Sequence, residues 1–251
     1  MSTGALPRRA LAEFVGSALL VTIVVGSGIA AERLSPGETG LQLLETSIAT
    51  ALGLAVLILT FGPVSGGHFN PVVSAVDWAI GRRAGLGLSA PQLGAYVLAQ
   101  MTGGVAGVVL ANLMFELPAV ELAGTERNGG GVLLAEVVAT AGLVAVVFAL
   151  ARNGRAAATA AAVGAYIGAA YWFTSSTAFA NPAVTVGRMF SDTFAGIAPA
   201  SVLPFLAAQS AGGLLGAALV LALYPDAPAA ADDVVVPHDE RATAGERKQR
   251  D

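Results

Sequence analysis

Long runs without a charged residue are the feature that most restricts what this chain can fold into. Four stretches contain no Asp, Glu, Lys or Arg: 46–76, 84–115, 156–187 and 193–225. Two more stretches, 10–31 and 131–151, contain a single Glu each. A helix needs roughly 20 apolar residues to cross a bilayer, and isolated strands cannot satisfy their backbone there. The runs therefore predict six membrane-spanning helices, near 10–30, 43–62, 90–112, 131–151, 157–176 and 200–224.

The composition excludes several other classes of protein. Hydrophobic residues fill 55% of the 251 positions, and 11 of the 30 charged residues (13 basic, 17 acidic) lie between Asp226 and Asp251. So little charge cannot cover a water-soluble domain, which argues against a soluble enzyme. With no cysteine and two histidines, we expect no metal site and no cofactor. The net charge of −4 and dispersed basic residues argue against nucleic acid as a partner.

The basic residues predict the orientation. Six of them would share one side of the membrane: Arg8, Arg9, Arg82, Arg83, Arg152 and Arg155. The opposite side would have Arg33, Arg127 and Arg188. Positive residues are enriched in cytoplasmic loops, so both termini are predicted to be cytoplasmic. On this basis, 1–9 is a cytoplasmic N-terminus and 225–251, which shows no periodicity, is a disordered cytoplasmic tail.

Two of the uncharged runs are too long for one span, and each contains a break. Run 46–76 passes through Gly62-Pro63 and Gly66-Gly67, and run 156–187 passes through 174–177, Thr-Ser-Ser-Thr. After each break a short apolar segment opens with Asn-Pro, at Asn70-Pro71 and Asn181-Pro182. These segments, about 70–80 and 181–190, cannot cross a bilayer and are predicted to be re-entrant half-helices.

Asn-Pro is a favourable start for a helix. Asn is a strong N-cap whose side-chain oxygen accepts from first-turn amides, and Pro suits the first helical position. The Asn NH₂ is then left to point away from the helix, at its positive end. Asn70 and Asn181 are therefore predicted to donate hydrogen bonds to a passing solute, while the two helix ends repel cations.

The two halves of the chain repeat one another. The pattern A-Q-x-x-G-G-x-x-G occurs at 99–107 and again at 208–216, and Ala12-Glu13 parallels Ala135-Glu136. Each half, about 10–115 and 131–224, contains three spans and one half-helix. Three is odd, so the second half must be inverted relative to the first. The predicted fold class is an all-α membrane protein with six transmembrane helices and two re-entrant half-helices, in one domain over 10–224.

These motifs resemble those of the aquaporin, or major intrinsic protein, family. The residues that carry the resemblance are 65–72, Ser-Gly-Gly-His-Phe-Asn-Pro-Val, and 179–184, Phe-Ala-Asn-Pro-Ala-Val. The resemblance covers about 8–224. It implies a homotetramer in the lipid bilayer, with one pore per subunit for water or small neutral solutes and no catalysis. The second motif keeps the family's Asn-Pro-Ala through Ala183, whereas Val72 stands where Ala is usual.

The resemblance also implies a selectivity filter, and here the sequence departs from the family. The position after the second Asn-Pro-Ala is usually Arg but is Val184 in this chain. Alignment places Thr50, Ala169 and Ala178 at the other three positions, with Gly168 as the alternative to Ala169. This small, uncharged set resembles bacterial aquaglyceroporins linked to arsenic handling, which implies passage of neutral As(OH)₃ and an inner-membrane location.

Several other polar residues allow more than one interpretation. Glu13 and Glu136 lie within the membrane, where an acid suggests proton relay, but the resemblance favours a structural brace for the broken loops. His68 is interpreted as loop packing, with pH gating as the alternative. Arg188 and Asp192, four residues apart, are predicted to pair. The aromatic run 171–173 is interpreted as packing or interfacial anchors rather than solute contacts.

Three functions are open on the sequence alone. We favour a passive channel for water, glycerol-like polyols and neutral metalloid acids. A strict water channel is the first alternative. An ion-coupled transporter is the second, because inverted repeats with broken helices also build transporters. Opposed Asn-Pro caps without a flanking acid argue against coupling to a cation.

Overall fold

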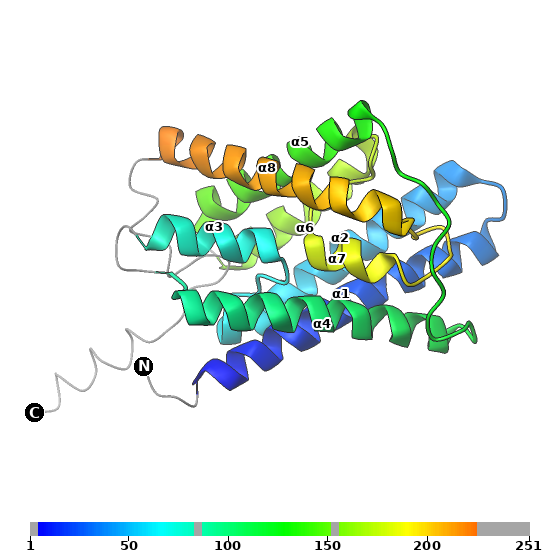
Figure 1. The fold of residues 1–251 in the computed structure, drawn as a ribbon, viewed down its shortest axis with the longest axis horizontal. Helices are drawn as coiled ribbons and strands as arrows, with labels where there is room; N and C mark the ends of the chain where they lie inside the picture. The colour runs from blue at the N-terminus through cyan, green and yellow to red at the C-terminus, as the bar shows by residue number, and fades with distance from the viewer. Residues whose placement is uncertain (1–4, 83–86, 152–155, 225–251) are drawn as a thin grey trace, which may run out of the picture.

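The structure, a computed structural model, describes residues 5–82, 87–151 and 156–224. Within those residues the chain is helical, with no strand. The helices are α1 Ala5–Leu34, α2 Thr39–Ser65, α3 Pro71–Gly81, α4 Ala90–Met114, α5 Gly130–Ala151, α6 Ala156–Phe173, α7 Pro182–Arg188 and α8 Pro199–Leu223. The six long helices run side by side, and the short α3 and α7 lie between α4 and α8 (Figure 1).

The predicted spans correspond to the long helices. In the described part of the chain, α1, α2, α4, α5 and α8 are long and apolar enough to cross a membrane. Helix α6 has 18 residues and packs between α2 and α5, at the place of the fifth predicted span, 157–176. It ends at Phe173, three residues earlier than expected. Helix α1 begins at Ala5, so it extends into the expected N-terminal segment 1–9, whereas the expected tail 225–251 lies outside the described residues.

Glycines let the long helices approach one another closely. Gly103 and Gly107 of α4 leave no room for a side chain because the backbone carbonyl groups of Phe14 and Ala18 in α1 fill that space. Gly212 and Gly216 of α8 pack in the same way on the carbonyls of Val137 and Ala141 in α5. Gly164 of α6 packs on the carbonyl of Ala51 in α2. These glycines therefore form close helix crossings, and both halves use equivalent positions of the repeated pattern.

The half-helices begin where the sequence predicts. The side-chain oxygen of Asn70 accepts from the Val72 amide at 3.0 Å, and that of Asn181 accepts from Ala183 at 2.9 Å. Helix α3 packs on α4 and α8, and α7 packs on the same two helices and on α1. Figure 1 shows α3 and α7 on opposite sides of the middle of the bundle, each with its first turn toward the other. This is the inverted arrangement that the repeat predicts.

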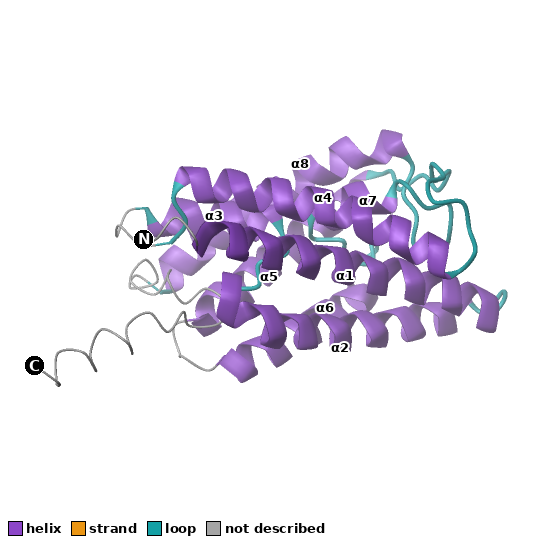
Figure 2. Cartoon of the chain, turned by 90° about the horizontal axis from the view of Figure 1, so that it is seen from below, coloured by secondary structure: helices purple, strands orange, loops and turns teal. Residues whose placement is uncertain are grey.

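The ends of the described chain share one end of the bundle. Helix α1 begins and α8 ends at the end where α3 also finishes (Figures 1 and 2). Large apolar side chains face outward along α2, among them Leu41, Ile48, Leu52, Val56 and Leu59. A helix with an apolar outer face fits lipid rather than water as its surroundings.

Candidate functional site

Two buried glutamates hold the loops that precede the half-helices. Glu13 on α1 accepts from the backbone amides of His68 at 3.0 Å and Phe69 at 2.7 Å, and from Gln100 Nε2 at 2.8 Å. Its equivalent on α5, Glu136, accepts from the amides of Phe179 and Ala180, both at 2.9 Å, and from Gln209 at 2.7 Å.

These are the loop-bracing contacts expected of Glu13 and Glu136. Neither carboxylate lines the cavity described below. A proton-relay role for the pair is therefore not supported by its position.

The two loops are also joined to each other across the centre of the molecule. Asn70 Nδ2 donates to the carbonyl of Ala180 at 2.8 Å, and Asn181 Nδ2 donates to the carbonyl of Phe69 at 2.7 Å. Phe69 and Ala180 both have a φ of +47°, in the left-handed region that non-glycine residues rarely adopt. In both Phe69 and Ala180, the N–H donates to the glutamate of the same half of the chain, and the C=O accepts from the Asn of the other half.

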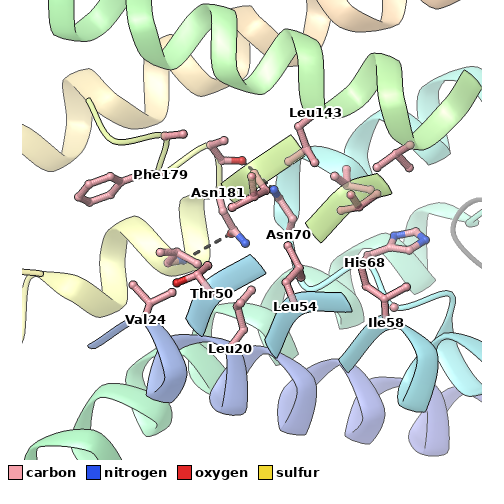
Figure 3. Close-up of a pocket in the computed structure, with 18 of the residues that line it drawn as sticks. Leu20, Val24, Thr50, Leu54, Ile58, His68, Asn70, Leu143, Phe179 and Asn181 are labelled. Atoms are coloured by element: carbon pink, nitrogen blue, oxygen red, sulfur yellow. Dashed lines mark hydrogen bonds between the residues drawn. The ribbon is translucent and has the colours of Figure 1, made fainter. Parts of the chain in front are cut away.

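A cavity passes along this junction. Its volume is about 50 Å³, enough for a few water molecules at roughly 10–15 Å³ each. Its lining includes Asn70, Asn181 and His68, together with residues spaced four apart on three long helices (Figure 3). These stripes are Thr50, Leu54 and Ile58 on α2, Leu143 and Val147 on α5, and Val163, Ile167 and Tyr171 on α6. The remaining lining residues are Leu20, Val24, Gly67, Val73, Ala178, Phe179, Ala180, Val184 and Arg188.

Thr50, Ala178 and Val184 line this cavity, whereas Ala169 does not line it. We call the part of the cavity around these three residues, where Thr50 meets Tyr171 and Val184 precedes Arg188 by one helical turn, the outer end. Ala169 is exposed on the opposite face of α6, so its assignment to the lining is wrong. Gly168 faces Ala51 of α2 and does not line the cavity either. The lining side chain from this turn of α6 is Tyr171, whose hydroxyl lies 3.1 Å from Thr50 Oγ1.

Tyr171 was missed because most residues of α6 are alanine or glycine, so the helix shows no polar face. The signal that could have found it is the spacing of Val163, Ile167 and Tyr171, which places the three bulkiest residues of one face in line. Trp172 and Phe173 are more than half exposed, as expected for anchors. The interpretation of the aromatic run 171–173 as packing or anchors is wrong for Tyr171, which lines the cavity, and fits Trp172 and Phe173.

Four other motif residues, Val72, Ala183 and the two prolines, position the half-helices and do not line the cavity. Val72 packs on Gly213 of α8, and Ala183 places its carbonyl against Gly104 of α4. Pro71 and Pro182 occupy the first turns of α3 and α7. His68 does line the cavity, and its Nδ1 lies 3.0 Å from Ser74 Oγ, which in turn accepts from Gln100.

Arg188 and Asp192 do not pair, contrary to expectation. Asp192 accepts from the Gly124 amide at 2.9 Å, whereas Arg188 turns inward and donates through Nε to the carbonyl of Ala195. The chain leaves α7 at Arg188, so Asp192 lies on a loop and the four-residue helical spacing does not apply. Arg188 lines the cavity one turn beyond Val184.

A second arginine lies beside it. Arg127, in the segment between α4 and α5, donates from Nε to the carbonyl of Gly196 at 2.9 Å. Burial lowers the pKa of this guanidinium, while the nearby Glu136 carboxylate acts in the opposite direction.

Comparison with known proteins gives one consistent family. The family model described as major intrinsic protein matches residues 1–175. The chain is 47% identical over 218 residues to aquaglyceroporin AqpS of Rhizobium meliloti, which covers 87% of this chain and 89% of the relative. It is 29% identical to the lens fiber major intrinsic protein of Gallus gallus over 239 residues, covering 86% and 80%.

Among solved structures, the aquaglyceroporin of Plasmodium falciparum matches with a TM-score of 0.65 and 17% identity, covering 88% of this chain and 98% of that one. At this identity the likeness concerns the fold alone.

Proposed function

The chain belongs to the major intrinsic protein family, a family of passive membrane channels, and on that basis we propose which solutes it conducts. They are water, glycerol-like polyols and neutral metalloid acids such as As(OH)₃. All of these carry hydroxyl groups and no net charge. The second Asn-Pro motif lies beyond the part of the chain that the family model matches, so its role here rests on the geometry above.

The observation that carries the proposal is the lining of the outer end. Val184 occupies the position where the family usually has Arg, and Thr50 and Ala178 beside it are small. The walls of the pore are then mostly apolar. Groups that can hydrogen-bond to a hydroxyl occur at a few points, on Asn70, on Asn181 and on the Thr50–Tyr171 pair. Such a lining suits a polyol, whose carbon face and hydroxyl face both need contacts.

One observation favours the alternative of a strict water channel. The Tyr171 ring stands at the outer end, where sequence alignment had placed an alanine, and the cavity volume is only about 50 Å³. A narrow aromatic constriction would pass water and exclude glycerol.

We further propose that the channel is a homotetramer in a bacterial inner membrane, with the outer end facing outward and both termini cytoplasmic. The first supporting observation is the apolar outer face of α2. The second is that α1 begins and α8 ends at one end of the bundle, while α7 runs toward the other end (Figure 1).

Flux through purified protein in liposomes tests the solute proposal. Stopped-flow light scattering would compare water, glycerol, urea and arsenite. We expect all four to pass, with flux linear in the gradient and insensitive to an uncoupler. Passage of water alone would select the strict water channel, and saturating flux that collapses with the uncoupler would indicate an ion-coupled transporter.

A further inference from the structure

Arg188 is a buried cation without an anionic partner. Its side chain is 4% exposed, and its Nε donates to the Ala195 carbonyl. Within the residues that the structure describes, no protein acceptor takes the N–H groups of its two terminal nitrogens. Arginine has five N–H donors and keeps its charge, so four donors and a full positive charge remain.

Arg127 adds a second cation to the same place. The guanidinium carbons of Arg188 and Arg127 lie 3.5 and 5.1 Å from the ring centroid of Phe179. Arg127 uses two of its nitrogens on the carbonyls of Gly196 and Phe194.

In the described residues, no carboxylate forms a direct ion pair with either guanidinium group. The oxygens of Glu136 accept from the amides of Phe179 and Ala180 and from Gln209, and Glu32 accepts from the Phe194 amide. The negative charge of Glu136 still favours both cations from a distance, but their burial outweighs this attraction.

Both guanidinium groups face a second cavity, which we call the vestibule. It has a volume of about 210 Å³, and Thr39, Thr46 and Thr177 also line it. Val24, Tyr171 and Arg188 line the vestibule and the central cavity alike, so the vestibule lies directly against the outer end of the pore.

Burying a cation is costly unless an opposite charge and hydrogen bonds compensate. A guanidinium fork matches two oxygens of one planar or tetrahedral group, and the hydroxyls of Thr39 and Thr177 can donate to the same group. Thr46 already donates its hydroxyl hydrogen to a backbone carbonyl of α2. We propose that the vestibule is a binding site for a small monovalent oxyanion, of carboxylate or sulfonate type, held by Arg188 and assisted by Arg127.

The position of this site gives it a consequence for conduction. An anion on Arg188 stands beside Val24 and Tyr171, at the pore entrance, and obstructs neutral solutes. It does not enter the pore itself, because the apolar walls of the central cavity cannot replace its hydration. Conduction is therefore inhibited by an oxyanion that is not itself conducted. The flux test of this idea rests on the proposed function.

Methanesulfonate is a suitable probe because it stays charged and does not cross lipid as an acid. Glycerol release from proteoliposomes would be measured with sodium methanesulfonate on both sides, against sodium chloride at equal concentration. With a dissociation constant on the order of 1 mM, about 10 mM probe would slow release roughly tenfold. Placing the probe on both sides makes the result independent of how the protein is oriented.

The variants Arg188→Gln and Arg188→Leu should lose the difference between the two salts, and Arg188→Lys should weaken it. Arg33→Leu is the matched control. Arg33 is an exposed arginine that donates to the Phe115 carbonyl and does not line the vestibule, so its loss should leave the block intact. Equal release in the two salts for the wild type, or an unchanged block in both Arg188→Gln and Arg188→Leu, would overturn the proposal.

A binding measurement separates this proposal from the proposed function. Methanesulfonate at about ten times its dissociation constant should raise the thermal midpoint of detergent-solubilised protein by about 3 °C relative to chloride. Arg188→Gln should show no such rise. A channel that fails to conduct glycerol but shows the rise would contradict only the proposed function. A channel that conducts glycerol and shows neither block nor rise would contradict only the anion site.

Discussion

Asn70 and Asn181 each donate to the carbonyl group just before the other, at 2.8 and 2.7 Å. An amide NH₂ carries two hydrogens, so one N–H of each Asn is committed to holding the opposite loop. The remaining N–H of each residue is available to the cavity that both side chains line. The same pair of residues therefore caps two half-helices, joins the two halves of the chain and keeps one N–H donor each at the cavity.

Asn181→Asp should lower neutral-solute flux about tenfold or more and raise cation leak. A carboxylate still caps α7, but it cannot donate to the Phe69 carbonyl, and losing that bond costs about 1–3 kcal/mol. It also places a negative charge between two positive helix ends. The measurements are glycerol flux and sodium leak in liposomes.

Asn128→Asp is the matched control for this change. Asn128 is exposed, and its oxygen accepts from Ser201, a bond that an aspartate retains. Its NH₂ donates to Glu126 at 3.3 Å, and this exposed bond, which the variant loses, involves neither half-helix cap. Unchanged flux and background leak in Asn181→Asp would mean that the caps do not determine selectivity.

Glu136→Gln should destabilise the protein by about 1–3 kcal/mol and reduce flux, because one loop amide would then face an NH₂ group. Glu13→Gln should behave alike, since it braces the equivalent loop. Thermal unfolding in detergent measures the first effect. Glu121→Gln, an exposed change, should leave the midpoint unaltered. A wild-type midpoint in both variants would refute the bracing role.

The sequence predicted most of this architecture because its strongest signals are local. Uncharged length marks a span, and Asn-Pro after a break marks the start of a half-helix. The repeat then predicts that the two starts meet. The bracing role of Glu13 and Glu136 comes from the resemblance, because an acid within the membrane suggests proton relay as readily. The physical reason for that role is that a buried acid needs donors and a broken helix supplies free amides.

The lining of the outer end depended on information that the sequence lacks. The rotation of α6 about its axis decides whether Ala169 or Tyr171 faces the cavity, and a helix of mostly alanine and glycine gives no pattern to fix it. The inward turn of Arg188 depends on where α7 ends and on the position of Ala195 across the loop. Both are tertiary features.

Gly107→Ala should destabilise the protein more than the addition of a single methyl group suggests. Its methyl group would meet the Ala18 carbonyl of α1, and forced contacts of this kind cost about 1–3 kcal/mol. Gly94→Ala on the same helix is the control, because nothing lies within 4 Å of where its methyl would be. That change should stabilise by up to about 1 kcal/mol through helix propensity. Equal thermal midpoints for the two variants would contradict close packing of α1 on α4.

Val184→Arg should leave the fold intact and cut the passage of glycerol and arsenite much more than that of water. The new guanidinium would project into a lumen bounded by Thr50, Ala178 and Tyr171 and would remove width that only the larger solutes need. It would lie one helical turn from Arg188, so the two cations would repel, and the wet vestibule and loop carbonyls would supply acceptors for their donors. A tenfold change in the glycerol-to-water flux ratio requires only about 1.4 kcal/mol of extra barrier, which a steric overlap at a constriction exceeds.

Stopped-flow measurements of both solutes on the same liposomes give the flux ratio directly. The control Val184→Leu adds bulk without charge and so separates the effect of pore width from that of electrostatics. If wild type excludes every solute larger than water, or if the ratio stays the same in Val184→Arg, Val184 does not set the width of this pore.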